Sequence, residues 1–195
     1  MNGQDAEREL NKLASRAVQN NPEATAELLA QIRPMVVRYC RARLGRTGGG
    51  AYTTADDVAQ EVCLAVLKAL PRYRDLGRPF SAFVFGIASH KVTDAHRGAS
   101  RNLSQLVDNV PEIEDGARGP EQQALASDVA RQVHALLRTL PDTHREVLIL
   151  RVAVGLSAEE TGKVLGMSPG AVRVTQHRAL ARLRQRAGQD AEVSA

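Results

Sequence analysis

An acidic stretch that is rich in glycine and proline interrupts the chain and constrains its fold more than any other feature. Residues 103–128 contain six acidic residues and one basic residue, a net charge of −5, together with two prolines and two glycines. Like charges repel, and proline and glycine interrupt regular structure, so we expect no packed core there. The sequence predicts an acidic flexible linker over residues 101–122, which joins two folded parts.

Both flanking parts carry the helical spacing of apolar residues. Helices are predicted over residues 22–44, 54–70, 79–97 and 125–140, where apolar side chains recur every three or four positions. Thr143 opens a capping-box pattern that predicts a further helix start. No segment alternates convincingly at period two, the pattern of a half-buried strand. The predicted fold class is therefore all-α, with two small helical domains.

The predicted linker divides the 195 residues into five segments. The polar segment 1–21, with scattered leucines, predicts a weak or frayed N-terminal extension. The other segments are a first helical domain at 22–100, the linker at 101–122, a second helical domain at 123–187 and a tail at 188–195.

Composition and motifs limit the classes of function. The chain has 26 Lys and Arg against 22 Asp and Glu, a formal net charge of +4 that is compatible with nucleic acid. The sequence contains no run of 18 apolar residues, so no membrane span is predicted, and no secretion signal is predicted at the start. Cys40 and Cys63 form no CxxC pair, which favours a reducing, cytoplasmic location. Because the catalytic and metal-binding motifs we considered are absent, neither an enzyme nor a metal or cofactor is expected.

The C-terminal part has the order of a helix-turn-helix. Ser157 opens a short helix in a capping-box pattern, a tight turn at Gly166 follows, and Ser168 with Pro169 opens a longer helix. Residues 168–186 contain five arginines and no acidic residue, which suits a DNA phosphate surface. The alternative is an ordinary helical bundle with a solvated basic face.

The helix predicted over residues 54–70 has an acidic face. At 100° per residue, the side opposite to the apolar residues carries Asp57, Gln60, Glu61, Leu64 and Lys68. An acidic stripe with one apolar residue suits a basic protein partner. A solvated face with an exposed leucine is the alternative.

Aromatic and basic residues are interleaved in the first domain. All six aromatic residues lie between Tyr39 and Phe85, and residues 68–101 hold seven basic residues against two acidic ones. Rings that stack on bases, with cations for the backbone, are what binding of single-stranded DNA requires. The alternative is that the rings fill the core, since Phe80 and Phe83 share one helical stripe.

These motifs together resemble bacterial RNA polymerase sigma factors of the extracytoplasmic-function (ECF) type, which contain only regions 2 and 4. The resemblance covers roughly residues 25–100 and 122–186. The stretches that carry it are Ala55–Val62 (ADDVAQEV), Phe80–Ala88 (FSAFVFGIA), Asp94–Arg97 (DAHR), Leu140–Arg151 (LPDTHREVLILR) and Gly155–Arg184.

The resemblance implies a sigma factor that binds core RNA polymerase and directs initiation at promoters with −35 and −10 elements. The first domain, as region 2, would bind the β′ coiled coil and melt the −10 element, so that single-stranded promoter DNA is bound. The second, as region 4, would bind the double-stranded −35 element and touch the β flap. An anti-sigma factor is a further partner that is compatible with the sequence.

The resemblance also assigns roles to residues by their position. Core-polymerase binding maps to Asp56, Asp57, Gln60 and Glu61. Binding of −10 DNA maps to Arg78, Phe80, Phe83, His90, Lys91, Asp94 and Arg97. Binding of −35 DNA maps to Ser168, Pro169, Gly170, Ala171, Arg173, Val174, Gln176, His177 and Arg178.

Departures from the family's pattern, and one competing interpretation, limit these expectations. Phe83 and His90 stand where Trp and Asn are usual, so the −10 base preference is not inherited. Gly162 stands where Ala is usual and lowers helix propensity by about 1 kcal/mol, which predicts a looser helix. The competing interpretation is a response-type regulator with a similar helix-turn-helix. It would carry an α/β domain, for which residues 1–120 show no strand pattern.

Overall fold

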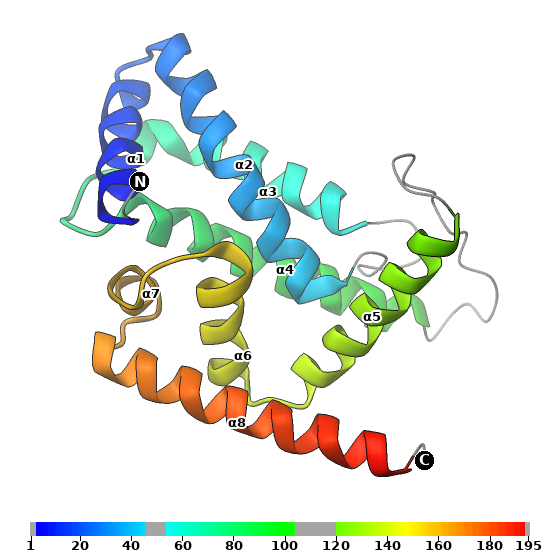
Figure 1. Ribbon diagram of the computed structural model, residues 1–195. Helices are drawn as coiled ribbons and strands as arrows, with labels where there is room; N and C mark the ends of the chain where they lie inside the picture. The colour runs from blue at the N-terminus through cyan, green and yellow to red at the C-terminus, as the bar shows by residue number, and fades with distance from the viewer. Residues whose placement is uncertain (1–2, 46–53, 104–119, 194–195) are drawn as a thin grey trace.

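The computed structural model describes residues 3–45, 54–103 and 120–193, whose arrangement Figure 1 shows. Every regular element in these ranges is helical, which confirms the predicted all-α fold. A 3-10 turn, η1 (Leu70–Arg72), follows α3, and a π-helical turn, η2 (Ile149–Val154), follows α6. Most of the predicted linker, residues 104–119, lies outside the described residues. The α-helices are α1 (Gly3–Val18), α2 (Pro22–Leu44), α3 (Ala55–Ala69), α4 (Phe80–Leu103), α5 (Pro120–Arg138), α6 (Asp142–Leu148), α7 (Ala158–Leu165) and α8 (Pro169–Val193).

Side-chain caps set two of the predicted helix starts. Thr54 Oγ1 accepts a hydrogen bond from Asp57 N (3.2 Å), and the Asp57 carboxylate accepts one from Thr54 N (2.9 Å). Ser157 and Glu160 form the same reciprocal pair at the start of α7. Each box satisfies two backbone donors that a helix end leaves without an intrahelical partner.

Two local predictions differ from the structure. The capping box predicted at Thr143 is wrong, because α6 begins at Asp142 with Pro141 as its N-cap, so Thr143 lies inside the first turn. Helix α4 continues to Leu103, beyond the predicted end at Arg97. The added segment contains one glycine and no proline, and a single glycine is tolerated within a helix.

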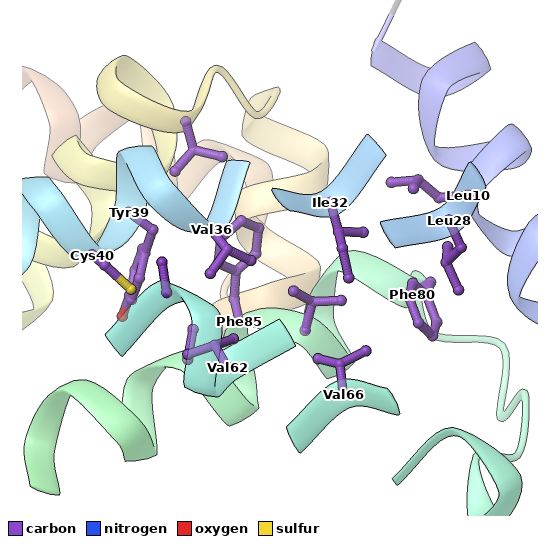
Figure 2. Close-up of a cluster of buried hydrophobic side chains, with 14 of the residues drawn as sticks. Leu10, Leu28, Ile32, Val36, Tyr39, Cys40, Val62, Val66, Phe80 and Phe85 are labelled. Atoms are coloured by element: carbon purple, nitrogen blue, oxygen red, sulfur yellow. The ribbon is translucent and has the colours of Figure 1, made fainter. Parts of the chain in front are cut away.

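One apolar core joins α1, α2, α3 and α4, and Figure 2 shows its centre. Ile32 and Val36 of α2 are fully buried, as are Val62 and Val66 of α3. These residues repeat at the predicted helical spacing, so each helix turns its apolar face inward.

The N-terminal helix is part of this core, in contrast to the weak or frayed segment that the sequence predicts. Leu10, Leu13, Ala14 and Ala17 of α1 are buried in the same cluster as α2 and α4. Most helical stability in proteins comes from packing of an amphipathic face, so polar composition alone underestimated α1.

The second part of the chain packs on the first, which the sequence did not predict. Ile149, Leu150 and Val154 of η2 belong to the same apolar cluster as α1 to α4. Two smaller clusters hold the remaining helices, one around Leu148 and Ala179 and one around Val147 and Val172. None of the described helices has an apolar stretch long enough to cross a membrane.

Candidate nucleic-acid and polymerase interfaces

The predicted acidic face of α3 lies on the molecular surface. Asp57, Gln60 and Glu61 are exposed, and Leu64 keeps 49% of its surface exposed. Because the opposite face of the helix is buried in the core, α3 presents this acidic stripe outward in a defined orientation. The stripe is available to a partner.

The carboxylates of α3 differ in what they already bind. Asp56 accepts two hydrogen bonds from Arg41 (2.8 and 2.6 Å). Hydrogen bonds from Thr54 hold the pKa of Asp57 below its ordinary value, which reflects its role as a helix cap. Glu61 pairs with Lys91 of α4 at 3.2 Å. Asp57 therefore caps the start of α3, a structural role that Glu61 does not have.

The aromatic residues predicted to bind −10 DNA divide into a buried and a half-buried one. Phe80 is fully buried within the core (Figure 2). Its assignment to the DNA surface is therefore wrong, because a ring enclosed by the core cannot stack on a base. Phe83 is half-buried, and its ring centre lies 5.5 Å from that of Phe80 and 5.0 Å from that of Tyr73.

The polar residues predicted for −10 DNA lie on the surface of α4 or just before it. Arg78, His90, Asp94 and Arg97 are exposed, and Lys91 is partly exposed. Asp94 and Arg97 form a surface ion pair at 3.8 Å. The Lys91–Glu61 pair places Lys91 directly beside the acidic stripe.

The loop 73–79 leads into α4 and contains side chains that were not in the predicted −10 set. Tyr73 is half-buried and its ring contacts Phe80 edge-on at 5.1 Å. Arg74 and Leu76 are exposed, and Leu76 keeps 80% of its surface. The interleaving of aromatic and basic residues was the sequence signal for this loop, but it did not single out individual side chains.

Helices α7 and α8 form the predicted helix-turn-helix. The turn contains Gly166 in the left-handed conformation, with φ of 68°. Ser168 Oγ accepts a hydrogen bond from Ala171 N (3.2 Å), as predicted for an N-cap. Val172 is buried against the cluster that also contains Ala158 of α7.

Gly162 serves a close approach between α7 and this turn. A Cβ atom at this position would lie 2.5 Å from the carbonyl oxygen of Met167. The sequence interpretation treated Gly162 only as a residue that loosens its helix. The structure shows that the missing side chain leaves room for the turn.

The outer face of α8 is exposed and basic. Arg173 forms an ion pair with Glu159 of α7 at 2.5 Å, and Gln176 Oε1 accepts a hydrogen bond from Arg151 Nε at 2.9 Å. Both predicted DNA-binding side chains therefore have protein partners in this state. Pro169 and Gln176 are half-buried, whereas the exposed members of the predicted −35 set are Ser168, Gly170, Ala171, Arg173, Val174, His177 and Arg178.

Comparison with known proteins identifies the family. Residues 28–102 match the family model of Sigma-70 region 2, and residues 130–183 match that of Sigma-70 region 4. The ECF RNA polymerase sigma factor ShbA of Streptomyces griseus is 56% identical over 180 residues, which cover 91% of this chain and 94% of ShbA. The chain belongs to the ECF RNA polymerase sigma factors. Its function is promoter-specific initiation of transcription with RNA polymerase.

A second relative by sequence and a solved structure are similar to this sigma factor as well. The ECF RNA polymerase sigma factor SigD of Mycobacterium tuberculosis is 54% identical over 175 residues, which cover 90% of this chain and 82% of SigD. The solved structure of CnrH in complex with the cytosolic domain of CnrY has a TM-score of 0.67 and 29% identity. It covers 95% of this sigma factor and 99% of that chain. CnrH is an RNA polymerase sigma factor of Cupriavidus metallidurans.

Proposed function

We propose that this sigma factor divides its work among three exposed surfaces. The acidic stripe of α3 binds core polymerase, the loop 73–79 with the exposed face of α4 binds and opens −10 DNA, and α8 reads the −35 element. The observation that carries the proposal is that the acidic and basic faces are both exposed and lie on separate helices. Each sign of charge thus has its own partner, a basic protein surface or DNA phosphates.

The proposal assigns region 2 to residues 22–100 and region 4 to residues 123–187, with the acidic linker between them. The chain catalyses no reaction of its own and acts in the cytoplasm, together with polymerase and DNA. An anti-sigma protein is proposed as a further partner, and the complex of CnrH with CnrY supports this.

Positive charges introduced on the acidic stripe of α3 test the polymerase contact. We expect Gln60→Lys with Glu61→Lys to weaken binding of core polymerase at least about tenfold, because each substitution places a cation opposite a basic partner. Asp57 is left intact, since its carboxylate caps α3. The control is Glu27→Lys, a reversal at an exposed residue of α2. Unchanged core affinity in the double variant would reduce the acidic stripe to a solvated face.

Substitution of Arg173 tests the −35 contact. If its guanidinium binds a base bidentately, Arg173→Ala should weaken binding to a −35 duplex by about 1–3 kcal/mol and relax its sequence preference. Arg16→Ala, at an exposed arginine of α1, is the control. Equal affinity of wild type and Arg173→Ala for matched and mismatched duplexes would contradict the assignment.

Run-off transcription tests the whole proposal. Purified core polymerase is incubated with genomic DNA of the host, with and without this chain. Discrete transcripts that require the chain are expected, and their start sites give the promoter. If none appears, and the chain also fails to bind core polymerase, the proposed division of work among the three surfaces is refuted.

A further inference from the structure

The first turn of α4 has no capping side chain of its own. The residue before Phe80 is Pro79, whose side chain carries no hydrogen-bond acceptor. The first backbone N–H groups of any helix lack intrahelical partners and must find acceptors elsewhere, particularly where they are buried. Phe80 and Ser81 are both buried, so their N–H groups need partners within the protein.

Helix α1 supplies those partners from far away in the sequence. Asn11 Oδ1 accepts a hydrogen bond from Phe80 N at 2.8 Å, and Glu7 Oε1 accepts one from Ser81 N at 3.1 Å. Glu7 and Asn11 are four residues apart, so they lie on the same face of α1. Two side chains of one helix thus cap another helix 69 and 74 residues further along the chain.

Hydrogen bonds to Glu7 offset only part of the cost of burying its carboxyl group. Its carboxylate lies at the positive end of α4, where a negative charge is favoured. Only 9% of Glu7 is exposed, and burial raises the pKa of its carboxyl above the ordinary value. A buried acid of this kind is retained at a cost unless it makes specific hydrogen bonds. The bond to Ser81 N therefore accounts for an otherwise unfavourable residue.

The capped turn carries the loop and the rings of the −10 surface. Loop 73–79 leads directly into Phe80, the first residue of α4. The backbone N–H of Phe80 is held by its hydrogen bond to Asn11. Tyr73 contacts Phe80 at 5.1 Å and Phe83 at 5.0 Å between ring centres. A shift of the first turn of α4 would therefore move both the exposed tip of the loop and the half-buried ring of Phe83.

We propose that Glu7 and Asn11 are positioning residues for the opening of −10 DNA, because they hold the first turn of α4 and the loop before it. The inference rests on the proposed role of this loop and of α4. It assigns to α1, which precedes the region 2 match at residue 28, a part in promoter opening rather than in packing alone.

The experiment compares duplex and pre-opened templates. Holoenzyme is formed with wild-type chain or with Glu7→Ala/Asn11→Ala, and open complexes are measured as heparin-resistant complexes that yield abortive transcripts, because thymines of a mismatched segment react with permanganate even without protein. The promoter is one selected by the run-off assay, used as a full duplex or with a mismatched −10 segment. Thermal unfolding and core affinity are measured first, and the assay temperature lies below the unfolding transition of every variant. Glu9→Ala, at an exposed residue of α1, is the control.

The expected result is selective. The double variant should lose about tenfold in open complexes on the duplex, the factor that corresponds to about 1.4 kcal/mol, within the range for loss of helix-capping residues. It should match wild type on the pre-opened template and in core affinity. Glu7→Gln/Asn11→Asp keeps an acceptor at both positions and should restore opening of the duplex.

Two outcomes would overturn the proposal. Full activity of the double alanine variant on the duplex would show that the caps position nothing needed for opening. Equal losses on both templates would show that α1 contributes to folding alone. A wild-type chain that forms no open complex with core polymerase would instead refute the proposed function itself, so the two failures are distinguishable.

Discussion

The contact between Glu146 and Arg43 offers a quantitative test of how the two parts of the chain are joined. Glu146 Oε2 lies 2.9 Å from Arg43 Nη1, and their side chains are only 15% and 14% exposed. Tyr39 also donates its hydroxyl to Glu146 Oε1 at 2.6 Å. One carboxylate of α6 therefore binds two side chains of α2. It forms an ion pair with the guanidinium of Arg43 and accepts a hydrogen bond from the hydroxyl of Tyr39.

The magnitude follows from burial and distance. At 2.9 Å and an effective dielectric constant of about 20, the Coulomb attraction is about 6 kcal/mol before desolvation is subtracted. Removing one partner of a buried pair costs about 3–5 kcal/mol, because the other charge is left unpaired. Both side chains keep a small exposure, so water can solvate the unpaired charge in part and reduce this cost. We therefore expect Glu146→Ala to destabilise the protein by about 3 kcal/mol.

Urea unfolding, followed by circular dichroism at 222 nm, measures this loss. Glu146→Gln keeps an acceptor for the Tyr39 hydroxyl and should cost less than Glu146→Ala. A double-mutant cycle with Arg43→Met isolates the pairwise coupling, and the double variant should be more stable than the sum of the single losses predicts. A loss below about 1 kcal/mol for Glu146→Ala, or a coupling within about 0.5 kcal/mol of zero, would refute the reasoning.

Four further predictions concern single residues. Gly162→Ala should lower the melting temperature, because the added Cβ meets the Met167 carbonyl oxygen at 2.5 Å. Gly86→Ala, with nothing within 4 Å, should raise it through a propensity gain of up to about 1 kcal/mol. Burial raises the pKa of Glu7 in the folded state, so its contribution to stability is fully present below the unfolded pKa and is lost as the pH rises through the folded pKa. Unfolding free energies measured from pH 4 to 8 should therefore fall more steeply for wild type than for Glu7→Gln, and parallel curves would contradict this. Leu76 keeps 80% of its surface at the tip of loop 73–79. Leu76→Ala should leave the melting temperature unchanged but reduce permanganate reactivity at −10, since apolar side chains act as wedges between bases.

Local chemistry made much of the architecture predictable. The apolar spacing of α2 and α3, and the capping boxes at Thr54 and Ser157, were legible in the sequence because each depends on residues only three or four positions apart. The helix-turn-helix was legible for the same reason. The exposed face of α3 could be predicted because the buried face was marked by its apolar residues.

The surroundings of the residues expected to bind −10 DNA were less predictable. Phe80 and Phe83 share one helical stripe, but only the packing of α1, α2 and α3 on α4 decided that Phe80 is enclosed while Phe83 is half-buried. The ring of Tyr73 contacts those of Phe80 and Phe83, and no local sequence pattern encodes these contacts. The need for glycine at position 162 likewise depends on tertiary structure, because the turn after α7 brings the carbonyl oxygen of Met167 close to it.

Residue type and short-range spacing were enough to predict α2 and α3, the caps at Thr54, Ser157 and Ser168, the acidic face of α3 and the family resemblance. The contacts by which Asn11 and Glu7 cap α4, and by which Glu146 joins α6 to α2, could be seen only in the folded protein. These contacts join residues 69 to 107 positions apart. Whether such side chains meet is set by how the helices pack, and helix packing depends on the shape of the whole core rather than on any local pattern.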